Sequence, residues 1–208
     1  MLNMIKIRFC NLRFYDRLLL LTIQEGMSKM VFVSEVYAAV PATCDTPLQE
    51  KVYQVLQELE IDFQRVETEE VITMEDCQQI NERLDMDMVK TLFLCNRQKT
   101  NFYLFVTSGD KPFKSKEFSQ ALEIARVSFA SAEQMDSMLG TKIGAATIFS
   151  TLLKDAGKVQ LVLDKDVCDQ EYYGCSDGTT TGYLKLKTED VLKKFLPYVK
   201  RQPKIIEV

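Results

Sequence analysis

The spacing of apolar residues predicts a succession of short helices and strands from about residue 46 onward. Thr46 and Pro47 are typical of a helix start, and apolar side chains then recur at helical spacing to about Glu60. Alternating apolar residues predict a hairpin of two strands, 89–95 and 102–107, joined by a polar loop. Further helices are expected near 73–84, 116–124, 131–140 and 188–199, and further strands at 61–66, 158–163, 183–187 and 205–208.

Hairpins mixed with helices, without regular βαβ alternation, indicate an α+β fold with a mixed, mainly antiparallel sheet flanked by helices. We expect a domain at 46–208, preceded by an N-terminal extension, 1–45, of little fixed structure. The apolar run 18–23 is too short to span a membrane and lacks a signal-peptide cleavage site. We interpret residues 1–29 as an amphipathic extension or the product of an upstream start codon, and expect their deletion to leave the rest folded.

Histidine is absent from all 208 residues, and this restricts the chemistry more than any other feature of the composition. No Ser-His-Asp or Cys-His relay can be built, and no zinc site with imidazole ligands. The six cysteines contain no CxxC pair, so no metal is expected, and reduced thiols fit a cytoplasmic protein. The net charge of -4 disfavours broad wrapping of nucleic acid, but it is compatible with contact to one end of it.

Lys90 is the most informative single residue. Strand alternation places it on the same face as Leu92 and Leu94. Such a lysine either packs its stem and keeps its ammonium in water, or offers a fixed positive charge at the rim of a pocket. The spacing alone leaves both interpretations open.

Two glycine-containing segments are candidate ligand-binding loops. The segment 174–182 combines three glycines with hydroxyl and carboxyl side chains, so it is either a ligand-binding loop or an ordinary polar connection. Its Cys175 could be a nucleophile, but no histidine is available to activate the thiol. The backbone amides of Gly144, Ala145 and Ala146 could contact a ligand, or this segment could be a tight turn into a packed helix.

Five segments together resemble the prolyl-tRNA synthetase-associated, YbaK-type editing-domain family in its freestanding form. The resemblance runs from about Thr46 to the C-terminus and implies a curled sheet with flanking helices around a small pocket. It further implies that the pocket accepts the aminoacyl-adenosine end of a mischarged tRNA, whose ester is hydrolysed without metal or organic cofactor. The segments are VKTLFLCNRQKTNFYLFVTSGDKPF (89–113), ARVSFASAEQMDSMLG (125–140), GAATIFSTL (144–152), KVQLVLDKDV (158–167) and GCSDGTTTGYLKL (174–186).

The resemblance assigns Lys90 to the family's functional lysine, whose ammonium would hold the tRNA 3′ end and would not act as a nucleophile. Gly144 falls on the glycine of the family's substrate loop, which often ends in proline where this chain has Ile148. A few phosphate contacts, from Lys90 and from Lys111 or Lys114, would suffice to hold the acceptor end.

Ser176 marks the main departure from the family pattern, because many members carry histidine there. Asp177 replaces the proline that follows, and Thr180 stands where asparagine is common. A serine hydroxyl supplies neither charge nor proton near neutral pH. A mechanism based on backbone-positioned water and the substrate's own hydroxyl would survive this change, whereas one that needs the histidine would not.

The expected function is that of a cytoplasmic, freestanding deacylase of mischarged aminoacyl-tRNA, most simply prolyl-tRNA carrying a small wrong amino acid such as alanine. The alternative is a catalytically silent binding module for aminoacyl-tRNA or an aminoacyl-adenosine-like ligand. A third hypothesis is a thiol-based or redox protein that uses Cys175. The expected partners are the tRNA acceptor end and an aminoacyl-tRNA synthetase, with no membrane. The sequence leaves the oligomeric state open.

Overall fold

Helix α2 (Pro47–Glu58) begins where the sequence predicts, in a computed structural model that describes residues 31–208. The Thr46 hydroxyl accepts a hydrogen bond of 3.1 Å from the amide of Gln49, and Pro47 occupies the first turn. The helix buries one face, which includes Leu48, Val52 and Leu56. The expectation for residues 1–29 lies outside the described part of the chain.

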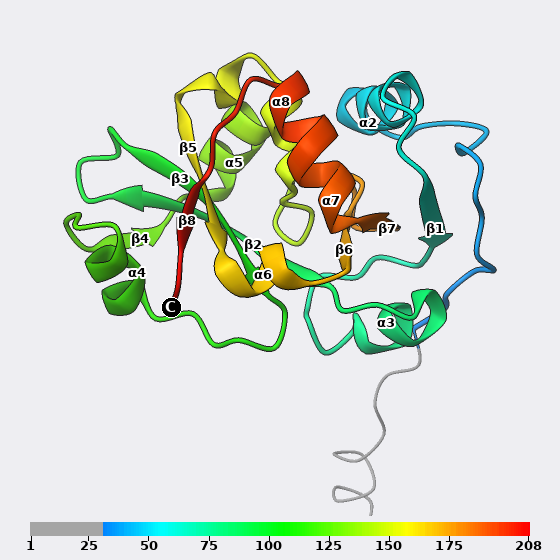
Figure 1. Ribbon diagram of the computed structural model, residues 1–208, viewed down its shortest axis with the longest axis horizontal. Helices are drawn as coiled ribbons and strands as arrows, with labels where there is room; N and C mark the ends of the chain where they lie inside the picture. Colours follow the sequence, from blue (N-terminus) through cyan, green and yellow to red (C-terminus); the bar gives the residue numbers. More distant parts are fainter. Residues whose placement is uncertain (1–30) are drawn as a thin grey trace, which may run out of the picture. The chain divides into compact units, whose positions relative to one another are not determined.

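The strands form two sheets, as Figure 1 shows. In the larger sheet, the central hairpin is extended by an antiparallel strand on one side and by two parallel strands on the other. The smaller sheet is antiparallel throughout. The larger has the order β4 (Val127–Phe129), β2 (Val89–Asn96), β3 (Phe102–Ser108), β5 (Val159–Asp164), β8 (Lys204–Ile206), and the smaller the order β1 (Phe63–Glu67), β7 (Gly182–Lys187), β6 (Tyr172–Ser176).

The expected α+β class with mainly antiparallel pairing is therefore confirmed, although the strands divide into two sheets instead of one curled sheet. A parallel bridge between Met88, just before β2, and Gly174 in β6 joins them. A side chain at Gly174 would place its Cβ 2.6 Å from Sδ of Met86 and 2.8 Å from the carbonyl oxygen of Asp87. Only glycine therefore permits this close approach.

The predicted helices are all present, with shifted ends. The Ser131 hydroxyl and the Gln134 side chain form a capping box at the start of α5, which ends at Gly140 with φ of 63°. The C-terminal helix is continuous through a π-helical turn, Val191–Phe195. The helices are α3 (Gln78–Leu84), α4 (Ser115–Ala121), α5 (Ala132–Leu139), α6 (Lys165–Asp169), α7 (Thr188–Asp190) and α8 (Leu196–Tyr198), and the short 3-10 segments are η1 (Ile148–Leu152) and η2 (Asp155–Lys158).

Strand alternation distributes the apolar side chains between the two faces of the larger sheet. In β3, Leu104 and Val106 belong to the main core with α2 and the C-terminal helix, whereas Tyr103 and Phe105 pack on the other face with Phe118 of α4. A separate apolar cluster joins the smaller sheet to α3. The hairpin thus has both faces covered, which gives the cavity described below a rigid wall.

Several elements differ from the sequence-based expectations. Strands β4 and β6 and helix α6 were not predicted, and the ambiguous segment 145–153 contains a 3-10 helix. Residues 73–77 form turns before α3. Residues 31–45, which we grouped with the N-terminal extension, lie in the same compact unit as the rest and bridge β1 through Val33 with Thr68 and Tyr37 with Arg65.

Candidate functional site

A cavity of about 390 Å³ is lined by strands of both sheets. Strands β2 and β4 contribute from the larger sheet, and β6 and β7 contribute from the smaller one. The connection from β1 to α3 and the connection from α5 to η1 supply most of the remaining residues, and Met88, Ala130 and Met135 complete the lining. The lining is mainly apolar, and three exposed side chains, Ile72, Phe129 and Ile143, belong to it.

Most of the residues that the sequence singled out meet at this cavity. The structure brings together Lys90, Gly144, Ala146, Cys175 and Ser176 from three separate segments. Two others do not line it. Ala145 is buried in the protein, and the hydroxyl of Thr180 donates a hydrogen bond to Glu70 outside the cavity. The chemical roles of these residues stay predictions.

Lys90 lies at the cavity, but its ammonium is largely committed to the protein. Its Nζ donates to the carbonyl oxygens of Gly109 and Lys111 at 3.1 and 2.5 Å. Partial burial lowers the pKa of Lys90, and the nearby carboxylate of Asp110 opposes this shift. An ammonium has three N–H donors, so one remains for a ligand.

The loop that receives Lys90 is itself fixed by a buried carboxylate. Nζ of Lys111 lies 2.9 Å from Asp164 and 2.7 Å from Asp166. Asp164 is fully buried and also accepts a hydrogen bond of 2.7 Å from the hydroxyl of Thr107. The charge of Lys111 compensates Asp164, and a contact of Lys111 with phosphate stays a prediction.

Gly144 is in a conformation that favours glycine. Its φ is +91°, and an added Cβ would lie 3.1 Å from Cα of Ile72 on the facing connection. The amide of Ala145 closes a turn on the carbonyl oxygen of Lys142 at 3.0 Å. Within residues 31–208, no backbone acceptor is found for the amides of Gly144 and Ala146, and both residues line the cavity.

The Ser176 hydroxyl is used to hold its own loop. It donates to the carbonyl oxygen of Thr179 at 2.6 Å and accepts from the amide of Gly178 at 3.0 Å. Its single proton is therefore committed, and Ser176 is nearly inaccessible to solvent. At the position where the resemblance leads us to expect histidine, this chain has a residue that stabilises a turn.

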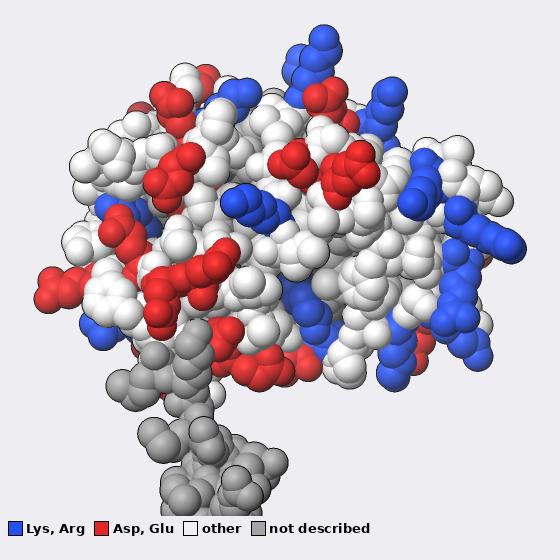
Figure 2. Space-filling view, turned by 180° about the vertical axis from the view of Figure 1, so that it is seen from behind, with Lys and Arg blue, Asp and Glu red and all other residues white. Residues whose placement is uncertain are grey.

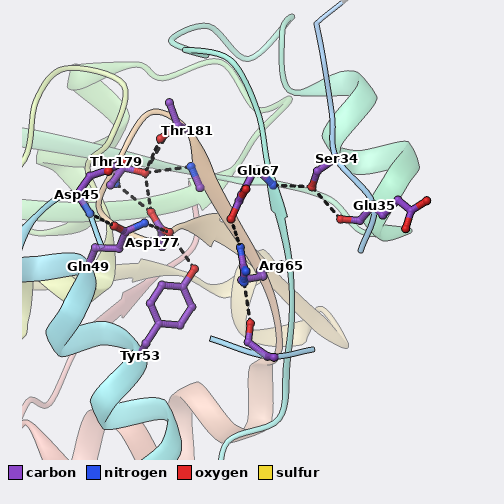
Figure 3. A network of polar contacts seen from close by, with 12 residues as sticks. Ser34, Glu35, Asp45, Gln49, Tyr53, Arg65, Glu67, Asp177, Thr179 and Thr181 are labelled. Carbon is purple, nitrogen blue, oxygen red and sulfur yellow. Dashed lines mark hydrogen bonds and ion pairs between the residues drawn. The ribbon is translucent and has the colours of Figure 1, made fainter. Parts of the chain in front are cut away.

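The sequence reasoning missed a buried network next to Ser176, which Figure 3 shows. Asp177 is fully buried, and its Oδ2 accepts hydrogen bonds from Gln49 at 2.8 Å and Tyr53 at 2.9 Å. Its Oδ1 accepts from the amide of Thr179 at 3.1 Å and from the Thr179 hydroxyl at 2.8 Å. The only sequence signal was the presence of two polar residues, Gln49 and Tyr53, four positions apart on the apolar face of a helix.

The thiols at the cavity are poor nucleophiles. Burial raises the pKa of Cys175, and burial with nearby carboxylates raises the pKa of Cys77 to about 11. Both thiols are protonated at neutral pH, which argues against the thiol-based hypothesis. In residues 31–208 no group of three or more metal-ligating side chains could hold a metal ion. The same residues contain no helix that is long and apolar enough to cross a membrane.

Comparisons with known proteins agree on one family. A model of the aminoacyl-tRNA editing domain matches residues 68–194, more than half of the chain. The prolyl-tRNA editing protein ProX of Acetoanaerobium sticklandii is 27% identical over 150 residues, which cover 72% of this chain and 91% of that protein.

Solved structures show the same fold. A crystal structure of a putative trans-editing enzyme for prolyl-tRNA synthetase superposes with a TM-score of 0.57 and 17% identity over 79% of this chain and 99% of the other. A crystal structure of a hypothetical protein gives a TM-score of 0.60 and 15% identity over 76% of this chain and 98% of the other. The chain belongs to the aminoacyl-tRNA editing domain family.

Proposed function

We propose that this chain is a trans-editing deacylase, which hydrolyses the ester between a tRNA and a wrong amino acid. The first substrate we assign is the tRNA specific for proline when it carries alanine by mistake. The observation that supports this most directly is the meeting of Lys90 and two backbone amides, of Gly144 and Ala146, at one mainly apolar cavity in a chain of the editing family.

The lining of the cavity favours an amino acid with a small, uncharged side chain as the group that is removed from the tRNA. Among the described residues that line it, Lys90 alone is charged, and the rest are mainly apolar, with two protonated thiols and the hydroxyl residues Thr91, Ser176 and Tyr183. Burial of a charged side chain against such walls would cost several kcal/mol, about what is lost when an ion is buried without a partner. Alanine fits this chemistry, and aspartate does not.

In the proposed reaction, the remaining N–H of Lys90 donates to an oxygen of the terminal nucleotide and holds it. The amides of Gly144 and Ala146 donate to the ester carbonyl oxygen, which becomes an oxyanion when water attacks the carbonyl carbon. The bond from that carbon to the ribose oxygen then breaks, and it releases the amino acid and a tRNA with free hydroxyls.

Among the described wall residues, neither the Ser176 hydroxyl nor the thiols are placed to act as a general base, because that hydroxyl is bonded within its loop and the thiols are protonated. The ribose hydroxyl next to the ester then relays a proton: it accepts one from the attacking water and passes its own to the ribose oxygen that leaves the carbonyl carbon. Positioning alone can supply several kcal/mol to such a step, so the rate does not require a side-chain base.

The test measures how fast three proteins remove alanine from the tRNA specific for proline. The proteins are wild type, Lys90→Met and a surface control, Lys187→Met. We expect Lys90→Met to lower kcat/KM at least tenfold and the control to match wild type. Prolyl-tRNA, the correctly charged product, should be hydrolysed far more slowly. No turnover of any alanyl-, cysteinyl- or seryl-charged tRNA by pure wild type would overturn the proposal.

A second candidate is a binding module without activity, and the commitment of Ser176 to its loop is the observation that favours it. Such a module would bind an aminoacyl-adenosine analogue with an amide in place of the ester, and would leave the ester substrate intact. Calorimetric binding of that analogue, measured beside the hydrolysis assay, separates the two candidates.

A further inference from the structure

Charged side chains are distributed unequally over the face shown in Figure 2. Basic side chains gather at the end of the molecule that carries α4 and the β2–β3 hairpin, and acidic ones gather toward the end with α3 and β1. The net charge of -4 hides this separation. We call the first region the basic end, and it consists of Arg97, Lys99, Lys114, Lys116 and Arg126.

The charges of the basic end are not needed by the fold. All five side chains are exposed, and in the described residues Arg97, Lys99 and Lys116 have no carboxylate partner. Lys114 pairs with Glu117 at 3.0 Å, but both are exposed, and such a pair contributes little stability. These cations therefore remain available to an anionic partner.

Two contacts link the basic end to the rim of the cavity. Phe129 lines the cavity and contacts the ring of Phe113, just before α4, with centroids 5.6 Å apart. Arg126 lies three positions before Phe129 and bonds to Ser115 at the start of α4. The pairing of Asn96 with Val127 places Arg97 and Arg126 at the same end of the β2–β4 ladder.

The other side of the cavity is acidic. The connection from β1 to α3 lines the cavity. It contains the exposed residues Glu69, Glu70 and Glu75, and the exposed Glu67 ends the strand before it. A polyanion whose end occupies the cavity is repelled there and attracted at the basic end. Lys111 is paired with Asp164 and Asp166, and the one remaining N–H of Lys90 is assigned above to the terminal nucleotide, so other cations must contact the stem.

We propose that the phosphate backbone of the tRNA acceptor stem leaves the cavity past Phe129 and lies on the basic end, with Arg97, Lys116 and Arg126 as its main contacts. This inference rests on the proposed function. It adds that the duplex part of the tRNA is held by charge through its backbone, and that the contacts to phosphate are separate from the residues at the reacting ester.

The test compares two double charge reversals of equal size. Arg97→Glu with Lys116→Glu alters the basic end. The control, Lys51→Glu with Lys154→Glu, alters two exposed lysines of a separate groove between α2, η1 and η2, which also lack carboxylate partners in residues 31–208. Each protein is assayed with two substrates: the tRNA specific for proline that carries alanine, and 3′-alanyl-adenosine, which has no stem. Binding of the uncharged tRNA is measured by fluorescence anisotropy across a salt series.

We expect the basic-end variant to raise KM for the charged tRNA at least tenfold and to leave hydrolysis of 3′-alanyl-adenosine unchanged. The slope of log binding constant against log salt should fall by about two, one for each lost phosphate contact. The control should match wild type in all three measurements, and circular dichroism melting should show both variants folded.

Equal binding of uncharged tRNA by wild type and the basic-end variant would overturn this inference, as would an equal loss in the control. A parallel loss of activity toward 3′-alanyl-adenosine would also overturn it, because the stem is absent there. Failure of the proposed function can be told apart from failure of this inference. If the proposed function is wrong, wild type hydrolyses neither substrate, and the binding of uncharged tRNA still tests the basic end.

Discussion

The hydroxyl of Tyr53 donates a hydrogen bond of 2.9 Å to the buried carboxylate of Asp177, and so joins helix α2 to a loop 124 residues later in the chain. Gln49, one helical turn earlier, donates to the same oxygen. No lysine or arginine pairs with Asp177 within residues 31–208, so neutral donors alone satisfy it. The contact fixes the loop that begins with Ser176 at the cavity wall.

Removal of one of these donors should destabilise the protein. Tyr53→Phe keeps the ring in place but leaves Asp177 with one hydrogen bond fewer, so we expect the free energy of unfolding to fall by about 1 to 3 kcal/mol. Urea denaturation measures this loss. Tyr198→Phe, which removes an exposed hydroxyl bonded to Glu58, is the matched control and should change the stability little. Equal stability of the two variants would contradict a structural role for the Tyr53–Asp177 bond.

Gly144→Ala should impair activity more than it impairs folding. The positive φ of Gly144 disfavours alanine, and the added Cβ meets the backbone at Ile72, so the two amides would shift. A displacement of this size lowers kcat/KM by roughly ten- to a hundredfold. Gly157→Ala is the control, since its Cβ would meet its first neighbour only at 3.8 Å. Unchanged deacylation by Gly144→Ala would exclude the amides from the reaction.

Lys111→Met should destabilise the protein although Lys111 is partly exposed. The substitution leaves Asp164 buried without a cation, and loss of one partner of a buried pair costs about 3 to 5 kcal/mol, less here because the lysine is solvated. The double variant Lys111→Met with Asp164→Asn should recover part of that loss. A double-mutant cycle in urea denaturation measures the coupling, and strictly additive effects would contradict it.

Ser176→Ala should lower stability by about 1 kcal/mol, because it removes the bond to Thr179 and the acceptor for the amide of Gly178. We expect kcat for alanyl-tRNA to fall less than tenfold, since the hydroxyl is committed to the loop. Single-turnover hydrolysis measures this effect. A loss of about a thousandfold would instead assign Ser176 a direct part in proton transfer.

Alkaline pH should unfold the protein more readily. Burial raises the pKa of Tyr53, Tyr183 and Cys175, and that of Cys77 from 9.0 to about 11. The unfolded chain therefore loses these protons first, and stability that is fully present below about pH 9 is lost as pH rises through the folded pKa values. Urea midpoints from pH 7 to 11 test this, with a slope of up to about 1.4 kcal/mol per pH unit per proton. A flat profile would contradict the burial of these groups.

The elements that local signals determine were predictable from the sequence. The start of α2, the β2–β3 hairpin and the capping box of α5 depend on residues within a few positions of each other. Strand β6 was missed because its residues are buried on both faces, so its sequence from Tyr172 to Ser176 shows no clear alternation. The three-residue strand β4 is too short to have a pattern.

The candidate site was only partly predictable, for a related reason. Strand alternation and loop composition singled out Lys90, Gly144 and the loop with Ser176, the family resemblance assigned their roles, and the structure places all three at one cavity. Their hydrogen-bond partners could not be foreseen. Lys90 is held by carbonyl oxygens of a loop that no periodicity connects to it, and the donors to Asp177 come from a distant helix.

The bridge between Met88 and Gly174 joins two sheets that are otherwise separate ladders, and each sheet forms part of the cavity wall. Side chains on β2 and β4 can change in size without disturbing the register of β6 and β7, and the reverse also holds. Substitutions in one sheet can therefore change the cavity volume that is open to an amino acid, while the strands of the other sheet keep their geometry. A fold of this kind can change the amino acid that it accepts through substitutions in one sheet at a time.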